Sequence, residues 1–226
     1  MKQKILLLED DPNLGFVLQE HLESNGFTVT LITNGEDGLE ESGRKRFDLC
    51  LVDVMMPRKD GFMFTREFRQ KDPDTPIIFL TAKSLKEDRV QGFKVGGDDY
   101  VTKPFSMEEL LLRIGAVLKR SRKSGLPGGS STIGKYEFDS DKQVLAKGSK
   151  KQKLTAKESQ LLQILSVHRN AVVQRSEILK SVWGDDSYFN GRSLDVFVSK
   201  LRKHLAGDSD LEIKSIHGKG FKLISP

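Results

Sequence analysis

Five apolar runs alternate with amphipathic segments over the first 120 residues. The runs predict strands near residues 4–9, 27–32, 47–53, 76–81 and 99–102. The segments between them carry apolar residues at helical spacing and predict helices near 12–24, 35–44, 61–71, 85–95 and 107–120. Continuous apolar strands separated by helices are typical of a parallel sheet that is covered on both faces. We therefore expect an α/β fold with a doubly wound, five-stranded parallel sheet.

The pattern changes after residue 120. Residues 121–131 have the Ser-, Gly- and Lys-containing composition of a flexible linker. Beyond it, short alternating runs at 132–153 predict a small antiparallel sheet, and Thr155 and Glu158 have the spacing of a capping box at the start of a helix. Two more helices are expected near 175–182 and 192–205, followed by two strands within 211–224. The predicted domains are therefore residues 1–120 and a small α+β domain of residues 132–226.

Charge is distributed unevenly between the two halves. Residues 1–120 contain 18 Lys and Arg against 21 Asp and Glu, whereas residues 121–226 contain 19 against 11. The acidic half suits a cation site, and the basic half suits a polyanion such as nucleic acid. A membrane surface would also attract basic residues, but no long apolar run or lipidation motif supports it, so we expect no membrane partner.

Two observations predict a cytoplasmic protein. The chain enters its first strand without the pattern of a signal peptide. The single cysteine, Cys50, falls inside a predicted buried strand, where a thiol acts as a small apolar side chain. A chain without disulfide-forming pairs suits a reducing compartment.

Polar residues follow four of the predicted parallel strands. They are Glu9, Asp10 and Asp11 after the first strand, Asp53 at the third, Thr81 at the fourth and Lys103 after the fifth. The carboxyl ends of parallel strands meet at one edge of a sheet, where ligands bind. Carboxylates there can hold Mg²⁺, and Asp53 can act as the nucleophile that forms an acyl phosphate. Solvated surface charge explains any one of these residues, but explains the whole set poorly.

This set resembles the receiver domain of two-component response regulators, a flavodoxin-like fold. The matching motifs are Glu9-Asp10-Asp11, Asp53 before Val54-Met55-Met56-Pro57, Asp60-Gly61, Thr81-Ala82 and Lys103-Pro104-Phe105, and the resemblance covers residues 1–120. It implies that Asp53 accepts phosphate from a sensor histidine kinase. It also implies that Glu9, Asp10, Asp53 and the main-chain carbonyl of Met55 hold Mg²⁺, with Asp11 as a spare acid.

The same resemblance implies a switch. Thr81 and Lys103 would stabilise the phosphoryl group, the Lys103–Pro104 peptide bond would be cis, and Tyr100 would turn inward when Thr81 moves toward the phosphate. Simple packing at the sheet edge is the alternative for Tyr100. A further group resembles the symmetric dimer face of one subfamily, with solvated charge as the alternative: Arg89, Asp98, Asp99, Glu109, Arg113 and Arg120.

The second half resembles the winged-helix output domain of that subfamily, OmpR/PhoB. The matching residues are Leu154-Thr155 with Glu158, Trp183, residues 192–203 and Gly218-Lys219-Gly220-Phe221. The resemblance places the helix near 192–205 in the DNA major groove and the terminal hairpin near the minor groove. The implied DNA-binding residues are Arg192, Ser193, Val196, Phe197, Lys200, Arg202, Lys203, Lys219 and Lys222. Of these, Lys200 and Arg202 are the expected base or phosphate contacts, while Phe197 and Lys222 replace the histidine and arginine common in relatives.

Together the two resemblances imply a phosphorylation-switched transcription factor that binds repeated half-sites in double-stranded DNA as a homodimer, with RNA polymerase as a further candidate partner. Two alternatives stay open: a DNA-binding regulator without the switch, and a phosphohydrolase with an aspartyl nucleophile. The complete Asp53, Thr81 and Lys103 set disfavours the first. Such hydrolases often have a carboxylate two residues after the nucleophile, where this chain has Met55. We therefore expect a regulator and not an enzyme.

Overall fold

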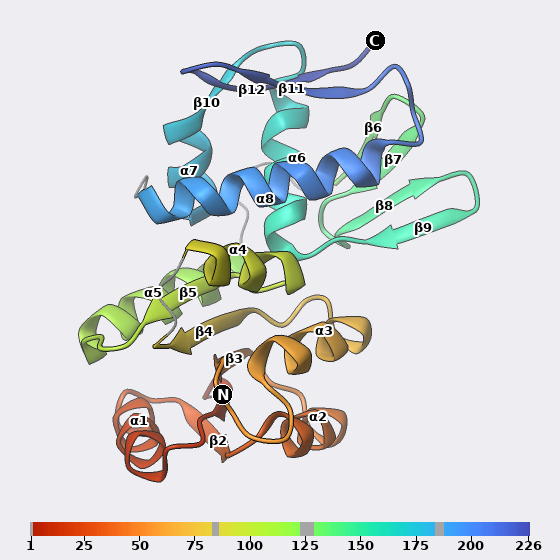
Figure 1. Cartoon of the computed structure of the whole chain (residues 1–226). Helices are drawn as coiled ribbons and strands as arrows, with labels where there is room; N and C mark the ends of the chain where they lie inside the picture. Colours follow the sequence, from red (N-terminus) through yellow and green to blue (C-terminus); the bar gives the residue numbers. More distant parts are fainter. Residues whose placement is uncertain (1, 83–85, 123–128, 184–187) are drawn as a thin grey trace. The chain divides into compact units, whose positions relative to one another are not determined.

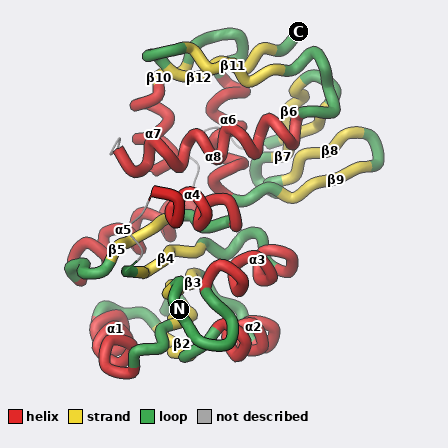
Figure 2. The backbone as a smooth tube through the Cα atoms, in the orientation of Figure 1, coloured by secondary structure: helices red, strands yellow, loops and turns green. Residues whose placement is uncertain are grey.

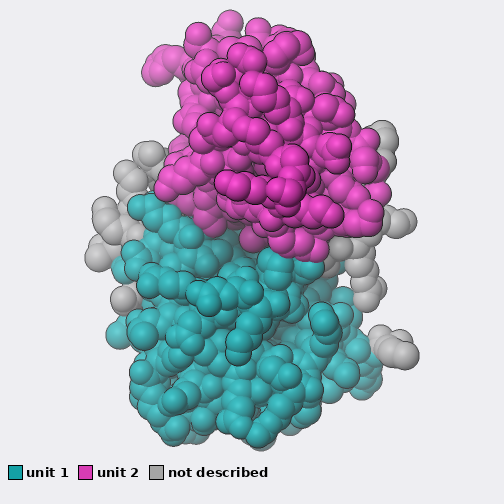
Figure 3. Space-filling view, turned by 90° about the vertical axis from the view of Figure 1, so that its right-hand side faces the viewer, with its two compact units in different colours: residues 1–119 teal, residues 120–226 magenta. Residues whose placement is uncertain are grey.

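The computed structural model describes residues 2–82, 86–122, 129–183 and 188–226. The chain divides into two compact units, residues 1–119 and 120–226 (Figure 3). The predicted linker, residues 121–131, lies largely outside the described residues, and its boundaries stay a prediction. No helix in the described ranges has the length and apolar character needed to cross a membrane.

Strands and helices alternate through the first unit, as the apolar runs predicted (Figure 1). In chain order the elements are β1 Lys4–Leu8, α1 Pro12–Ser24, β2 Thr28–Ile32, α2 Gly35–Arg44, β3 Leu49–Asp53, α3 Gly61–Lys71, β4 Ile77–Thr81, α4 Lys86–Val95, β5 Asp99–Thr102 and α5 Met107–Arg122. The five strands are parallel in the order β2-β1-β3-β4-β5. This is the flavodoxin-like order, and it confirms the predicted fold class.

Local sequence explains where the helices of this unit begin. The side chains of Asp11, Asn34 and Asp60 accept hydrogen bonds from main-chain N–H groups in the first turns of α1, α2 and α3. Such N-caps satisfy donors that the helix itself leaves without partners. Asp11, expected to be a spare acid of the cluster, therefore has a defined structural use as the cap of α1.

A continuous apolar core fixes α1 and α5 against the sheet. It joins Leu18 and Leu22 of α1 and Ile114 of α5 to strand residues such as Leu7 and Leu51. All five side chains are at most 1% exposed. Strands buried to this degree hold their carboxyl ends in fixed positions, which matters for the polar residues there.

The described residues of the second unit form two antiparallel sheets and three helices, whose arrangement can be followed in Figure 2. Its elements are β6 Ser130–Ile133, β7 Tyr136–Asp139, β8 Val144–Lys147, β9 Lys150–Lys153, α6 Ala156–Val167, β10 Val173–Gln174, α7 Arg175–Trp183, α8 Tyr188–Leu205, β11 Glu212–Ile216 and β12 Gly220–Ile224. The sheets have the orders β6-β7-β8-β9 and β10-β12-β11. Helices α6, α7 and α8 pack on one another, and β12 packs against α6 and α7.

The expected small sheet, three helices and terminal hairpin are all present. The capping box is also confirmed: the Thr155 N–H donates to Glu158 Oε2 at 2.9 Å, and the Glu158 N–H donates to Thr155 Oγ1 at 3.4 Å. Two features differ from expectation. Helix α8 begins at Tyr188, four residues earlier than predicted, and the two-residue strand β10 is too short to produce an alternating pattern.

Candidate functional site

Three carboxylates meet at the carboxyl edge of the parallel sheet. Glu9 and Asp10 follow β1, and Asp53 ends the neighbouring strand β3, whose Val52 pairs with Leu8. One carboxylate oxygen from each acid lies within 4.8 Å of the others. Glu9 and Asp53 are 1% and 5% exposed, whereas Asp10 is open to solvent. The topology thus brings together the acids that the sequence placed at strand ends.

The ammonium of Lys103 lies among these acids. Its Nζ donates to Glu9 at 2.7 and 2.9 Å and to Asp53 Oδ2 at 2.6 Å. The main-chain N–H of Lys103 donates to the Thr81 carbonyl at 2.9 Å, and the Lys103–Pro104 peptide bond is cis, as the resemblance implied. One cation among three carboxylates leaves this edge of the sheet with a net negative charge.

Burial and ion pairing shift the pKa values of Glu9 and Lys103. Burial raises the pKa of the Glu9 carboxyl above its ordinary value, and the Lys103 ammonium offsets only part of that effect. Burial alone would lower the pKa of Lys103, but its bonds to Asp53 and Glu9 raise that pKa above the usual value for lysine. Lys103 is therefore charged at neutral pH and balances part of the carboxylate charge.

The position of Asp53 depends on a close turn of the chain after β3. Its Oδ1 accepts a hydrogen bond from the Met55 N–H at 2.9 Å. The Gly61 N–H donates to the Val54 carbonyl at 3.0 Å, which draws the start of α3 against the end of β3. A Cβ atom at residue 61 would overlap the Asp53 carbonyl oxygen. Glycine is required there by close approach of the main chain.

Thr81 and Tyr100 belong to the adjacent strands β4 and β5. Thr81 is fully buried at the end of β4, where it pairs with Thr102. Tyr100 is 7% exposed, and its ring lies 6.0 Å from that of Phe79, centroid to centroid, in a tilted arrangement. The packing role considered for Tyr100 is therefore present. Its role as a switch stays a prediction.

The donor set fits Mg²⁺. The ligand atoms are all carboxylate oxygens, they converge within a few ångströms, and exposed Asp10 leaves room for the waters that Mg²⁺ retains. The carboxylates also outnumber the one ammonium paired with them. The Met55 side chain is 56% exposed, and participation of its main-chain carbonyl stays a prediction.

Asp98 is buried and paired within the first unit. It is 4% exposed, its carboxylate lies 2.8 Å from Arg69 Nη2, and it also accepts a bond from the Ile77 N–H at 2.9 Å. Arg69 Nε donates to the Gly96 carbonyl at 2.9 Å. This buried ion pair holds α3 against the segment before β5, and contact of Asp98 with a second copy of the chain stays a prediction.

Three other members of the predicted face form a cluster within the unit. Arg113 Nη1 lies 3.2 Å from Asp99, and Arg113 Nε donates to Glu109 Oε1 at 3.0 Å. The side chains of Arg89 and Arg120 lie outside the described part of the structure. Exchange of partners between this cluster and a second copy of the chain stays a prediction, as does dimerisation.

Helix α8 buries two residues that were expected to bind DNA. Ser193 and Phe197 are 0% and 1% exposed, and the Phe197 ring lies 5.6 Å from that of Trp183 in α7. Both lie on the side of α8 that packs against α6 and α7. Both side chains are enclosed in this core, so the burial argues against a direct DNA contact, and their assignment as DNA contacts stays an untested prediction.

Lys200 and Arg202 are engaged inside the unit. Lys200 Nζ lies 3.7 Å from Glu158 Oε1 and 5.2 Å from the centre of the Phe197 ring. The Arg202 guanidinium donates to the Ile213 carbonyl at 2.8 and 2.7 Å and to Ser215 Oγ at 2.9 Å. These contacts hold α8 against α6 and β11, and contact of either residue with DNA stays a prediction.

The other predicted DNA-binding residues are placed as follows. Lys203 and Lys219 are exposed, Val196 and Lys222 are half-buried, and the Arg192 side chain lies outside the described residues. The sequence did not reveal that Glu158, beyond its capping role, faces both Lys200 and His204, whose Nε2 is 3.7 Å from Glu158 Oε1. The spacing of Lys200 and His204, four residues apart on one helix, is the signal that could have indicated a shared partner.

Comparison with protein families gives one match within each of the two units. Residues 5–115 match the response regulator receiver domain, and residues 149–223 match the C-terminal domain of transcriptional regulatory proteins. The transcriptional regulatory protein RprY of Bacteroides fragilis is 54% identical over 226 residues, covering 100% of this chain and 96% of that protein. The alkaline phosphatase synthesis transcriptional regulatory protein PhoP of Bacillus subtilis is 34% identical over 236 residues, covering 100% and 98%.

Solved structures give the same result over the whole length. A RitR mutant matches with a TM-score of 0.79 and 25% identity, covering 99% of this chain and 100% of that one. DrrB of Thermotoga maritima, described as an OmpR/PhoB homologue, matches with a TM-score of 0.54 and 31% identity and covers 100% of both chains. The chain belongs to the two-component response regulators of the OmpR/PhoB subfamily, transcriptional regulators that join a receiver domain to a winged-helix DNA-binding domain.

Proposed function

We propose that Asp53 accepts a phosphoryl group from a sensor histidine kinase and that phosphorylation drives dimerisation on repeated half-sites in double-stranded DNA. The observation that carries this proposal is the setting of Asp53. Its two oxygens contact the Met55 N–H and the Lys103 ammonium at an edge of the sheet that carries two further acids. A related solved structure is described as the BeF3-activated receiver domain of DrrB, 36% identical over 53% of this chain.

The transfer follows from the nucleophilicity of a carboxylate. An oxygen of Asp53 attacks phosphorus, the P–N bond to the kinase histidine breaks, and an acyl phosphate forms. Lys103 and Thr81 then contact the phosphoryl oxygens through an ammonium and a hydroxyl. Glu9, Asp10, Asp53 and the Met55 carbonyl would hold Mg²⁺, which when bound neutralises charge on the incoming group.

The output of the switch is proposed to be DNA binding. The exposed part of α8, with Lys203, and the β11–β12 hairpin, with Lys219 at its turn and Lys222, supply positive charge to one surface. The cluster of Asp99, Glu109 and Arg113, with Arg89 and Arg120, is the proposed dimer face. RNA polymerase is proposed as a partner at the promoter, and the expected cytoplasmic location and lack of an enzymatic role stay predictions.

Phosphorylation of an Asp53→Ala variant tests the first step. With acetyl phosphate and Mg²⁺, the wild-type chain should acquire acid-labile phosphate and D53A should acquire none, because the variant lacks the nucleophile. Asp48 precedes the same strand at its opposite end and is exposed, so D48A is the matched control and should be phosphorylated normally. Acid-labile phosphate on D53A would show that the nucleophile is another residue.

Footprinting on genomic fragments tests the output. Phosphorylated protein should protect paired half-sites at a lower concentration than unphosphorylated protein. Equal protection by both forms would support the alternative of a regulator that binds DNA without the switch.

A further inference from the structure

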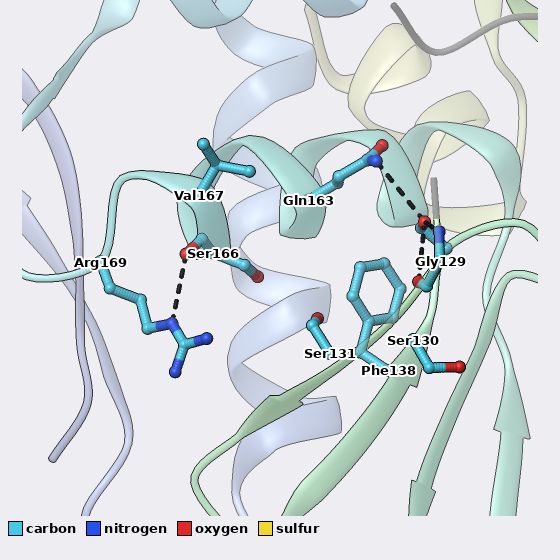
Figure 4. A pocket seen from close by; sticks show the side chains of 9 residues that line it. Gly129, Ser130, Ser131, Phe138, Gln163, Ser166, Val167 and Arg169 are labelled. Atoms are coloured by element: carbon cyan, nitrogen blue, oxygen red, sulfur yellow. Dashed lines mark hydrogen bonds between the residues drawn. The ribbon is translucent and has the colours of Figure 1, made fainter. Parts of the chain in front are cut away.

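Two hollows among the described residues of the second unit are not used by the proposed function. One, of about 390 Å³, lies between β6, β7 and α6 (Figure 4). Its polar groups bond to one another: Gln163 Nε2 reaches Ser140 Oγ at 3.5 Å, and Arg169 Nε donates to the Ser166 carbonyl at 3.2 Å. Groups already satisfied in this way give no reason to expect a ligand.

The other hollow has a different character. It measures about 800 Å³ and lies between the β8–β9 hairpin and the C-terminal end of α8. Three lysines and a histidine line it, Lys147, Lys150, Lys151 and His204, and no carboxylate does. Lys150 and Lys151 are exposed, and neither takes part in an ion pair among the described residues.

The hairpin itself concentrates positive charge at a cost to its own stability. Its ten residues, 144–153, include four lysines and no acid. Lys147 and Lys150 are directly opposite each other in the antiparallel register. Like charges in that position repel and destabilise a hairpin. An arrangement of this kind is favourable when an anion lies against it.

Contacts with α8 place the hairpin beside the helix surface that is proposed to face DNA. Gln152 Nε2 and His204 Nδ1 lie 2.6 Å apart, and Lys147 Nζ donates to the Gly207 carbonyl just beyond α8. On the other flank of α8, Arg202 bonds to β11. Because a helix turns about 100° per residue, positions 202 and 204 lie about 200° apart around its axis.

Three exposed residues of α8 lie between those two flanks. Asp195, Ser199 and Lys203 are exposed and project from the arc between positions 202 and 204. One basic hairpin, β11–β12, therefore borders this exposed strip on one side, and a second, β8–β9, borders it on the other.

We infer that the β8–β9 hairpin is a second DNA-contacting wing, whose lysines bind the phosphate backbone on the side of α8 opposite the C-terminal hairpin. The inference rests on the proposed binding of DNA by α8. A polyanion suits the hairpin because the charged side chains of the hairpin are all positive. Its lysines present point charges without a shaped recognition pocket. Contacts of this kind add affinity without sequence preference.

Protection of a sheet edge is the simpler explanation for these lysines. Strand β9 is the edge strand of its sheet, and lysines on edge strands prevent pairing with other chains. That explanation predicts no change in DNA binding when the charges are removed, whereas the inferred wing predicts a change in salt dependence.

The test compares variants of the full-length protein on one duplex, recovered from a random-sequence library by the wild-type protein. The variant K150Q/K151Q removes both charges, and K150R/K151R keeps them. Lys142 is in the same sheet region but is paired with Asp139 at 2.9 Å, so K142Q is the matched control. The association constant is measured by fluorescence anisotropy over a range of KCl concentrations, and Trp183 fluorescence confirms that each variant is folded.

Two phosphate contacts should contribute about 1.8 to the slope of log K against log[salt]. Between about 50 and 200 mM KCl, the wild-type protein should therefore lose about 12-fold more affinity than K150Q/K151Q. K150R/K151R and K142Q should retain the wild-type slope.

Equal slopes for K150Q/K151Q and the wild-type protein would overturn the inference while leaving DNA binding by α8 intact. If K150Q/K151Q kept the wild-type slope but self-associated more weakly in sedimentation, the hairpin would contact a protein partner. That result would also overturn the inference. Failure of the wild-type protein to recover any duplex would instead remove the proposed function on which the inference rests.

Discussion

Replacing Glu158 by glutamine removes one buried charge and leaves the shape of its site almost unchanged. Glutamine can occupy the same position in a capping box, so the cap of α6 is retained. The substitution instead removes the attraction to two side chains of α8, because Lys200 and His204 each have a nitrogen 3.7 Å from Glu158 Oε1. The variant therefore isolates the contribution of the carboxylate charge to the packing of α6 against α8.

The pKa of Glu158 gives the size of the contribution that its charge makes to the unfolding free energy. Burial alone would raise it, but His204, Lys200 and the Thr155 N–H lower the pKa of this carboxyl from an ordinary 4.5 to about 2. At about 1.4 kcal/mol per pKa unit, the ionised form stabilises the fold by about 3 kcal/mol at neutral pH. The side chain is only 6% exposed, so solvent screening of this value is small.

The sign of the pH dependence follows from a lowered pKa. The stabilisation is complete above the unfolded-state pKa near 4.5 and is lost as pH falls through the folded-state pKa near 2. The difference in unfolding free energy between the wild-type protein and E158Q should therefore be about 3 kcal/mol at neutral pH and roughly half that near pH 3.

Urea unfolding of the full chain measures this difference. Trp183 is the single tryptophan, and it is buried in the second unit, so its fluorescence reports the unfolding of that unit. Glu177 is exposed in the first turn of α7, and E177Q is the matched control. The electrostatic explanation would be refuted if E158Q lost no more unfolding free energy than E177Q. It would also be refuted if the loss in E158Q were the same below pH 4 as at neutral pH.

Three further predictions concern the first unit. Arg69→Met leaves Asp98 buried without its cation and should cost about 3–5 kcal/mol in urea unfolding followed by circular dichroism; a cost below about 1 kcal/mol would mean that the pair adds little. Gly61→Ala should displace the Asp53 main chain and slow phosphorylation by acetyl phosphate, whereas Gly43→Ala, where a Cβ atom meets nothing within 4 Å, should not. Charge reversal at Arg89 should weaken dimerisation of the phosphorylated protein in sedimentation, and adding Glu109→Lys should partly restore it; unchanged association in both would exclude this face.

The acidic site could be predicted from sequence because each member adjoins a continuous apolar strand. Parallel topology then brings the ends of β1 and β3 together regardless of loop detail, so Glu9 and Asp53 had to be neighbours. Asp98 could not be placed in the same way. Its burial depends on Arg69, 29 residues earlier in the chain, whose reach across α3 leaves no periodic signal.

The burial of residues on α8 does leave a periodic signal. Leu194, Phe197, Val198 and Leu201 have the spacing of a single apolar face, and all four are at most 1% exposed. Phe197 thus shares the apolar face of the helix, although its resemblance to a histidine position in the subfamily suggested a DNA contact. Strand β10 could not be predicted from the sequence, because two residues are too few to show an alternating pattern.

The contacts of α8 also restrict its proposed recognition of DNA. Of its basic residues near the centre and end, Lys200 faces Glu158, Arg202 is bonded to β11, and His204 is close to Gln152. Lys203 is the basic member of the exposed strip that it forms with Asp195 and Ser199. Lysine provides a point charge and no planar fork, so it recognises phosphate more readily than a base pair. Binding energy should therefore come largely from backbone contacts by the helix and its two flanking hairpins, with strong salt dependence, while discrimination between sequences depends on the few remaining side chains that reach base edges.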